Sequence, residues 1–116
     1  MSEDLKAFAR LLLPSFIVEH FEITEIDQLA DRIDFYLEEK PSCPKEYSHN
    51  QIISHGFHKQ AMIKDFPIRG KQVYLYVKRR RWLIKDTKEV VSIDWKVIAE
   101  GTRLTEEFAT FLKGIN

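Results

Sequence analysis

The stretch over residues 71–82, KQVYLYVKRRRW, constrains the fold of this chain more than any other part of the sequence. Its apolar residues alternate with aromatic and charged ones, which is the pattern of an extended strand with one buried face. The alternation places Val73, Leu75 and Val77 on one face, and Tyr74, Tyr76, Lys78, Arg80 and Trp82 on the other. The first of these faces is therefore expected to lie in the hydrophobic core.

The opposite face of this strand lines up aromatic rings with cationic groups, the chemistry that proteins use to stack on bases and to neutralise phosphates. Arg79 and Arg81 add positive charge to the core side where the strand ends, so both faces are cationic there. Two interpretations stay open. One is a nucleic-acid contact, which the two-sided charge favours. The other is an edge strand whose solvated lysines and arginines discourage aggregation.

Charge divides the sequence into two unlike halves. Residues 1–40 carry four Lys and Arg against ten Asp and Glu, a balance of −6, and residues 41–116 carry fourteen against eight, a balance of +6. This polarity predicts a cationic working surface on the second half of the chain. The acidic half is interpreted as a partner surface, as a guard against indiscriminate binding to polyanions, or as a solvated face.

Length and composition predict one domain over residues 1–116. With 44% hydrophobic and 31% charged residues, the chain is typical of a soluble globular protein. No apolar run reaches the roughly 20 residues that cross a bilayer, and the acidic start lacks the features of a secretory signal. Cys43 is the single cysteine, which rules out an internal disulfide and fits a reducing compartment. We therefore expect a cytoplasmic protein with no membrane partner.

The element order predicts an α+β fold with an N-terminal helix, a β-hairpin, a three-stranded antiparallel meander and a C-terminal helix. The helix and hairpin take residues 1–40, a loop residues 41–51, the basic meander residues 52–98 and the last helix residues 102–114. Turns of the meander are expected at residues 67–70 and 86–88.

Two details of the first 40 residues matter for the structure. The apolar stripe of the first helix, formed by Leu5, Phe8, Ala9 and Leu12, is interpreted as core. Two alternating segments predict a hairpin with its turn near residues 28–31, and in the second segment Ile33, Phe35 and Leu37 face the core while Asp34, Tyr36 and Glu38 face solvent. A helix over the same segment stays open as an alternative, because Ile26, Leu29, Ile33 and Leu37 also fit helical spacing.

The sequence offers no catalytic constellation. Its four glycines stand alone, so there is no phosphate-cradling loop, and no pair of carboxylates is brought together as acid and base. Cys43, His49, His55 and His58 are of types that bind zinc, but their spacing, C-x5-H-x5-H-x2-H, matches no standard site. We expect no enzyme, no metal and no other cofactor. His58 lies near enough to the basic strand to touch phosphate, although nothing in the sequence singles it out.

Four segments within residues 15–112 carry a family resemblance: FEITEIDQLADRIDFYLEEK, SCP, HGFHKQAMIKDFPIRGKQVYLYVKRRRW and GTRLTEEFATFL. They resemble the N-terminal region of bacterial insertion-sequence transposases of the ISL-three kind, and most closely the short, separate N-terminal region proteins of Bacteroidetes elements. The part DFPIRGK…KRRRW is the most specific. The resemblance implies a role in positioning a transposase on the ends of its element.

In that family the central block belongs to a zinc-binding module with two cysteine pairs. Here Cys43 is the one match, and the other positions fall at Glu46, Ile84 and Glu89. The resemblance thus implies a β module held together by its hydrophobic core without zinc. The family's catalytic carboxylates lie in a separate nuclease-like domain, which implies that this chain does not cut DNA itself.

The residues and the resemblance together predict a non-catalytic, DNA-binding or accessory N-terminal region of a transposase. Its expected contacts with double-stranded DNA are Lys71, Lys78, Arg79, Arg80, Arg81, Trp82, Lys85 and Lys88. Tyr74, Tyr76 and Trp82 would pack on sugars or unpaired bases unless a packed helix covers them, and in that case Arg79 and Arg81 would make the contact. Two alternatives stay open: a protein-interaction module that docks the catalytic transposase subunit without binding DNA, and a binder of single-stranded RNA. A homo-oligomer is compatible with either.

Overall fold

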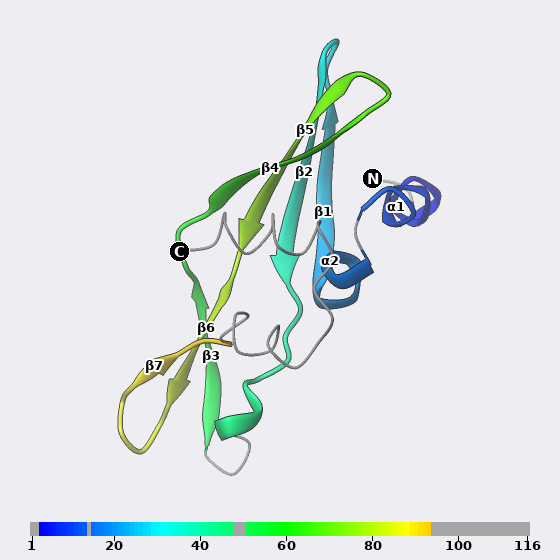
Figure 1. Cartoon of the computed structure of the whole chain (residues 1–116). Helices are drawn as coiled ribbons and strands as arrows, with labels where there is room; N and C mark the ends of the chain where they lie inside the picture. Colours follow the sequence, from blue (N-terminus) through cyan, green and yellow to red (C-terminus); the bar gives the residue numbers. More distant parts are fainter. Residues whose placement is uncertain (1–2, 14, 48–50, 94–116) are drawn as a thin grey trace.

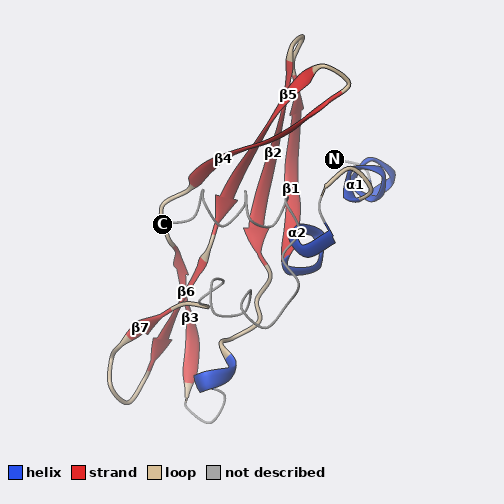
Figure 2. Cartoon of the chain, in the orientation of Figure 1, coloured by secondary structure: helices blue, strands red, loops and turns tan. Residues whose placement is uncertain are grey.

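The computed structural model describes residues 3–13, 15–47 and 51–93. In these residues two short helices precede two β-sheets (Figures 1 and 2). The elements are α1 (Glu3–Arg10), α2 (Ser15–His20), β1 (Phe21–Gln28), β2 (Arg32–Glu39), the 3-10 helix η1 (Lys45–Tyr47), β3 (Ile52–Phe57), β4 (Ala61–Ile68), β5 (Lys71–Lys78), β6 (Arg80–Ile84) and β7 (Val90–Val91). The chain is thus mixed α+β, as the sequence predicts, and mostly β. The expected C-terminal helix at residues 102–114 lies outside the described residues.

The strands form a four-stranded sheet in the order β1-β2-β5-β4 and a three-stranded sheet in the order β3-β6-β7. Figure 1 shows the smaller sheet beyond the end of β5, with α1 and α2 beside the larger sheet. β5 pairs in parallel with β2 and antiparallel with β4. The antiparallel pairings predicted for the meander are present between β4 and β5 and between β6 and β7. The prediction of a single sheet is wrong, because the strands are divided between two sheets and β5 takes a parallel neighbour from the first half of the chain.

The predicted hairpin at the start of the chain is confirmed, and its helical alternative is wrong. β1 and β2 pair antiparallel, and the Leu29 N–H donates to the Arg32 carbonyl at 2.9 Å across the turn. Phe35 and Leu37 of β2 are buried, in the alternation that the sequence predicts for this strand. A register shift after Ile23 marks a bulge in β1, which bends this edge strand.

The main core lies between the two helices and one face of the larger sheet. Val73, Leu75 and Val77 of β5 are all buried there, which confirms the predicted inner face of that strand. The helical side of this core is small, because Ala9, Leu13 and Ile17 supply its buried residues.

The apolar stripe predicted as core on α1 is for the most part exposed. Phe8 keeps 62% of its surface accessible, and Leu5, Leu11 and Leu12 are exposed as well. Ala9 alone of the predicted stripe is buried. The prediction is wrong here because the helix meets the sheet through Ala9 and the following Leu13 and so turns its larger side chains outward.

Residues 52–84 form one long, bent hairpin that contributes to both sheets. Near its turn β4 pairs with β5, and further out β3 pairs with β6. The pairing shifts register between Ser54 and Phe57 and again between β3 and β4, so the ribbon changes direction where residues 58–60 pass Arg79. The predicted continuous strand over residues 71–82 is consequently interrupted at Arg79.

The turn of this hairpin is tight. Ile68 and Lys71 are paired, so Arg69 and Gly70 are the two central residues. Both have positive φ angles, 49° and 79°, as a type I′ turn requires. Glycine adopts such a φ without cost, whereas an arginine does so with some strain.

Candidate nucleic-acid interface

The eight residues nominated by the sequence lie in three places. Lys71 begins β5 at the hairpin turn, and Lys78 ends it. At about 3.3 Å per residue these two lie about 23 Å apart. Lys85 and Lys88 are exposed between β6 and β7. The remaining candidates meet where the chain passes from one sheet to the other: Lys78, Arg79, Arg80, Arg81 and Trp82.

Arg80 has a structural role at this junction. Its Nε donates to the Glu39 carbonyl at 2.7 Å, and its backbone N–H donates to Glu39 Oε1 at 3.3 Å. Its guanidinium also lies 4.8 Å from the centre of the Phe57 ring, a cation–π contact. Arg80 thereby ties the last residues of β2 and β3 to the start of β6, which argues against it as a primary contact with phosphate.

Trp82 is buried, with 7% of its surface accessible, and this removes it from the candidate contact surface. It pairs with Ser54 in β3 and with Val91 in β7. Ile84, two residues further along β6, is buried as well. The sequence alternation assigns Trp82 to the face of Tyr74, but the interruption at Arg79 transfers β6 to the smaller sheet, where Trp82 takes an inner position.

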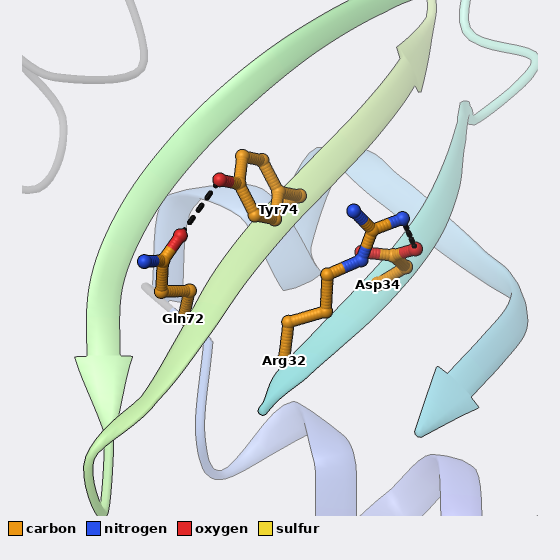
Figure 3. Close-up of polar contacts among 4 residues, drawn as sticks. All are labelled: Arg32, Asp34, Gln72 and Tyr74. Atoms are coloured by element: carbon orange, nitrogen blue, oxygen red, sulfur yellow. Dashed lines mark hydrogen bonds and ion pairs between the residues drawn. The ribbon is translucent and has the colours of Figure 1, made fainter. Parts of the chain in front are cut away.

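Tyr74 and Tyr76 lie on the outer face of the larger sheet, opposite the buried residues of β5. The Tyr76 ring stacks on Tyr36, with centroids 4.8 Å apart and planes at 12°. Tyr74 lies 5.4 Å from the Arg32 guanidinium and donates from its hydroxyl to Gln72 at 2.7 Å (Figure 3). Each ring thus has a partner within the protein, which favours a structural role over stacking on bases.

The β1–β2 half of this outer face is acidic. Asp34 is 2% exposed, although the alternation predicts a solvent face, and its Oδ2 accepts from Arg32 Nη2 at 2.9 Å (Figure 3). This hydrogen bond raises the pKa of Arg32. Asp27 lies opposite Asp34 on β1. The pKa of Tyr36 is raised, first by desolvation and then by the carboxylates of Asp27 and Asp34, which is the effect of a negative local field.

The local field at the sheet junction has the opposite sign. The His58 backbone N–H donates to the Arg79 carbonyl at 2.8 Å, so the histidine lies beside the interruption between β5 and β6. The pKa of His58 is lowered, first by burial and then by the positive charges of Arg79 and Arg81. We call His58, Arg79 and Arg81 the junction cluster.

Arg81 has a distinct position within the junction cluster. Its Nη2 lies 3.6 Å from where a Cβ at Gly56 would be, so the guanidinium lies over a stretch of β3 without a side chain. Its Nε is buried and has no hydrogen-bond partner. The positive φ of Gly56, 76°, belongs to the same irregularity in β3. The irregularity in β3 therefore leaves space for the Arg81 guanidinium, whose Nε has no hydrogen-bond partner in the protein.

Lys78 is less clearly part of a cationic surface. Glu38 is its neighbour across the β2–β5 pairing, and a carboxylate in that position offsets the ammonium charge. Both residues line a shallow hollow of about 700 Å³ on the outer face, together with Glu25 and Tyr36. Lys78 thus lies on the border between the acidic and the basic surface.

Sequence reasoning gives no means of selecting His58 over the other histidines. The decisive fact is the register of the 52–84 hairpin, which brings residues 58–60 level with Arg79. A strand predicted over residues 57–66 would place His58 inside a strand, whereas it follows β3. If the turn is placed at Arg69 and Gly70, counting residue pairs outward from it brings His58 within a few residues of Arg79.

The described residues contain no group of three or more His, Cys, Asp or Glu side chains that could hold a metal ion. Cys43 and His55 are exposed, and His49 lies outside the described residues. In the described part of the chain no helix has the length and apolar character needed to span a membrane.

The comparisons with known proteins were made at three levels. No protein-family model, no curated protein and no solved structure matches the chain.

Proposed function

We propose that this chain is a non-catalytic DNA-binding module that contacts backbone phosphates through the junction cluster. The observation that carries the proposal is the positive field of Arg79 and Arg81, which acts on His58 at an irregular, partly exposed turn of the ribbon. Proteins bind DNA without catalysis through such concentrations of Arg and Lys. Lys85 and Lys88, exposed in the β6–β7 turn at the other end of β6, would supply further phosphate contacts. The sequence resemblance supports the N-terminal region of a transposase as the setting, with the ends of the element as its DNA.

The acidic face of β1 and β2 also supports this proposal, because it disfavours DNA binding elsewhere on the protein. The exposed carboxylates of Glu25 and Asp27 on β1 repel phosphate, so a duplex is favoured at the junction over the β1–β2 face. Because the net charge of the chain is zero, the acidic β1–β2 face and the cationic junction cluster would orient the protein on DNA and would not give it a general affinity for polyanions.

The salt dependence of binding tests the proposal. Each phosphate contact on duplex DNA contributes about 0.9 to the slope of log K against log salt, so four contacts weaken binding about 150-fold between 50 and 200 mM salt. The measurement is fluorescence anisotropy with a labelled duplex over this range. The double variant Arg79→Gln, Arg81→Gln is expected to reduce the slope by about 2.

A matched control keeps the change in charge the same. Lys64→Gln combined with Lys71→Gln also removes two cations from the long hairpin, but at the end near its turn. We expect this variant to keep the slope within about one unit of the wild type. Equal losses in both variants would show that only net charge matters, and absence of binding at low salt would exclude the proposal.

A second function is favoured by one specific observation, the exposed apolar side chains of α1 and the turn that follows it. Leu5, Phe8, Leu11 and Leu12 are exposed next to the acidic residues of the first helical turn, Glu3 and Asp4. A complementary partner is an apolar surface bordered by Lys or Arg, and the candidate from the resemblance is the catalytic transposase subunit. Calorimetry with that subunit tests the docking: Phe8→Ser with Leu11→Ser should abolish it, and the arginine double variant should not.

A further inference from the structure

We propose that His58, Arg79 and Arg81 form one phosphate seat, in which His58 takes up a proton when a phosphodiester of the DNA backbone binds. This inference rests on the proposed DNA-binding function and deepens it. It names a third ligand, which is neutral in the free protein at neutral pH, and it makes the affinity for DNA dependent on pH.

The geometry brings the three side chains together from two chain segments. Arg79 lies across the hairpin from His58, and the Arg81 guanidinium lies over Gly56, two residues before His58. The hydrogen bond from the His58 N–H to the Arg79 carbonyl, at 2.8 Å, fixes the histidine beside them. The Nε of Arg81 is buried, so a phosphate oxygen would accept from the terminal nitrogens of its guanidinium.

The histidine ring is held in place by a second contact. Its Nε2 lies 2.6 Å from Ser92 Oγ, just after β7. In the imidazolium both ring nitrogens carry a proton, so Nε2 can donate to Ser92 while Nδ1 donates to the ligand. Among the described residues Ser92 is the one side chain in hydrogen-bond contact with the ring.

The charged groups that act on His58 from the elements around it are Arg79, which follows β5, and Arg81 in β6. Burial is the main cause of its lowered pKa in the free protein, and the charges of Arg79 and Arg81 lower it further. A phosphodiester between the arginines cancels part of that charge repulsion and supplies an acceptor. We therefore expect the pKa of His58 to rise on binding, and by linkage the affinity for DNA to rise as the pH falls between the bound and the free pKa.

An NMR titration measures this effect directly. The ring signals of His58 and His55 are followed from pH 5 to pH 8 in the free protein, with a saturating duplex, and with dimethyl phosphate, a monoanionic diester that does not titrate in this range. His55 is the internal control, since it is exposed in the same segment of β3. We expect both ligands to raise the pKa of His58, with no comparable effect on the ring signals of His55.

The affinity for duplex DNA at constant ionic strength gives a second measure. Uptake of one proton allows up to about a tenfold gain in affinity per unit fall in pH within the window. His58→Gln keeps a polar group near Ser92 and cannot titrate, so its affinity is expected to lose this component, whereas His55→Gln keeps it. If His58→Gln does not fold, the NMR titration of the wild type still decides the question.

Each outcome of these titrations decides. A rise in the pKa of His58 with the duplex, whether or not dimethyl phosphate raises it as well, supports the seat. Tight duplex binding with an unchanged His58 pKa overturns the seat and leaves the proposed function in place. A response to dimethyl phosphate without duplex binding keeps the seat and overturns the proposed function. No response to either ligand overturns both.

Discussion

At the scale of single residues, the three consecutive arginines show how identical side chains acquire different roles. Arg80 is hydrogen-bonded to Glu39 and lies against Phe57, whereas Arg81 lies over Gly56 with a buried, unpartnered Nε. The sequence could predict that this run is cationic. It could not predict which arginine is used internally, because that depends on where β2 ends and on a bulge in another strand.

The first prediction separates these roles. Arg80→Ala removes a hydrogen bond from a charged donor and a cation–π contact, so we expect a loss of about 1.5–3 kcal/mol in the free energy of unfolding. Arg81→Ala is expected to change stability by less than about 0.5 kcal/mol but to reduce the salt slope of DNA binding. Urea unfolding and anisotropy on both variants test this, and a reversed order would contradict it.

The second prediction concerns the hairpin turn. Gly70→Ala is expected to cost about 1 kcal/mol through its positive φ alone, since an added Cβ would have nothing within 4 Å. Arg69→Asn should be neutral or stabilising by some tenths of a kcal/mol, because Asn-Gly is the preferred type I′ pair. Thermal unfolding of the two variants gives both values. Equal effects of the two changes would argue against this turn geometry.

At the scale of elements, alternation predicts strands well and predicts their partners poorly. The inner face of β5 and the β1–β2 hairpin follow from local patterns, and both are confirmed. The parallel pairing of β2 with β5 depends on residues about forty positions apart in the sequence, so no local pattern contains it. Coverage of Trp82 by a helix is an alternative that the sequence leaves open, but its inner position in a second sheet is not contained in any local pattern.

The third prediction follows from the exposed α1. Phe8→Ala is expected to cost less than about 1 kcal/mol, because most of the ring surface is already in contact with water. Ile17→Ala in α2, at a fully buried position, should cost about 2–5 kcal/mol. Urea unfolding of the two variants, Phe8→Ala and Ile17→Ala, measures both losses. A large loss for Phe8→Ala would mean that its ring is covered in solution.

At the scale of the whole molecule, stability responds to pH through His58. Its folded pKa is lowered, so the unfolded chain binds more protons between that value and the ordinary 6.5. The free energy of unfolding therefore falls as the pH drops through this window. Well above pH 6.5 the histidine is neutral in both states and does not change the stability.

The fourth prediction tests that response. Wild type is expected to lose more stability between pH 7 and pH 5 than His58→Gln, because glutamine has no proton to gain. Chemical unfolding at a series of pH values, with His55→Gln as the control, measures the difference. Parallel curves for wild type and His58→Gln would contradict the lowered pKa.

The shared hairpin of residues 52–84 also has a consequence for assembly during synthesis. β1 and β2 leave the ribosome well before β5, so the first hairpin waits with one sheet edge open until its parallel partner arrives. A short loop closes at Arg69 and Gly70 at low entropic cost, and the ribbon that forms there completes both sheets in one event. Until then the carboxylates along β1 and β2 keep an unfinished edge from pairing with a neighbouring nascent chain.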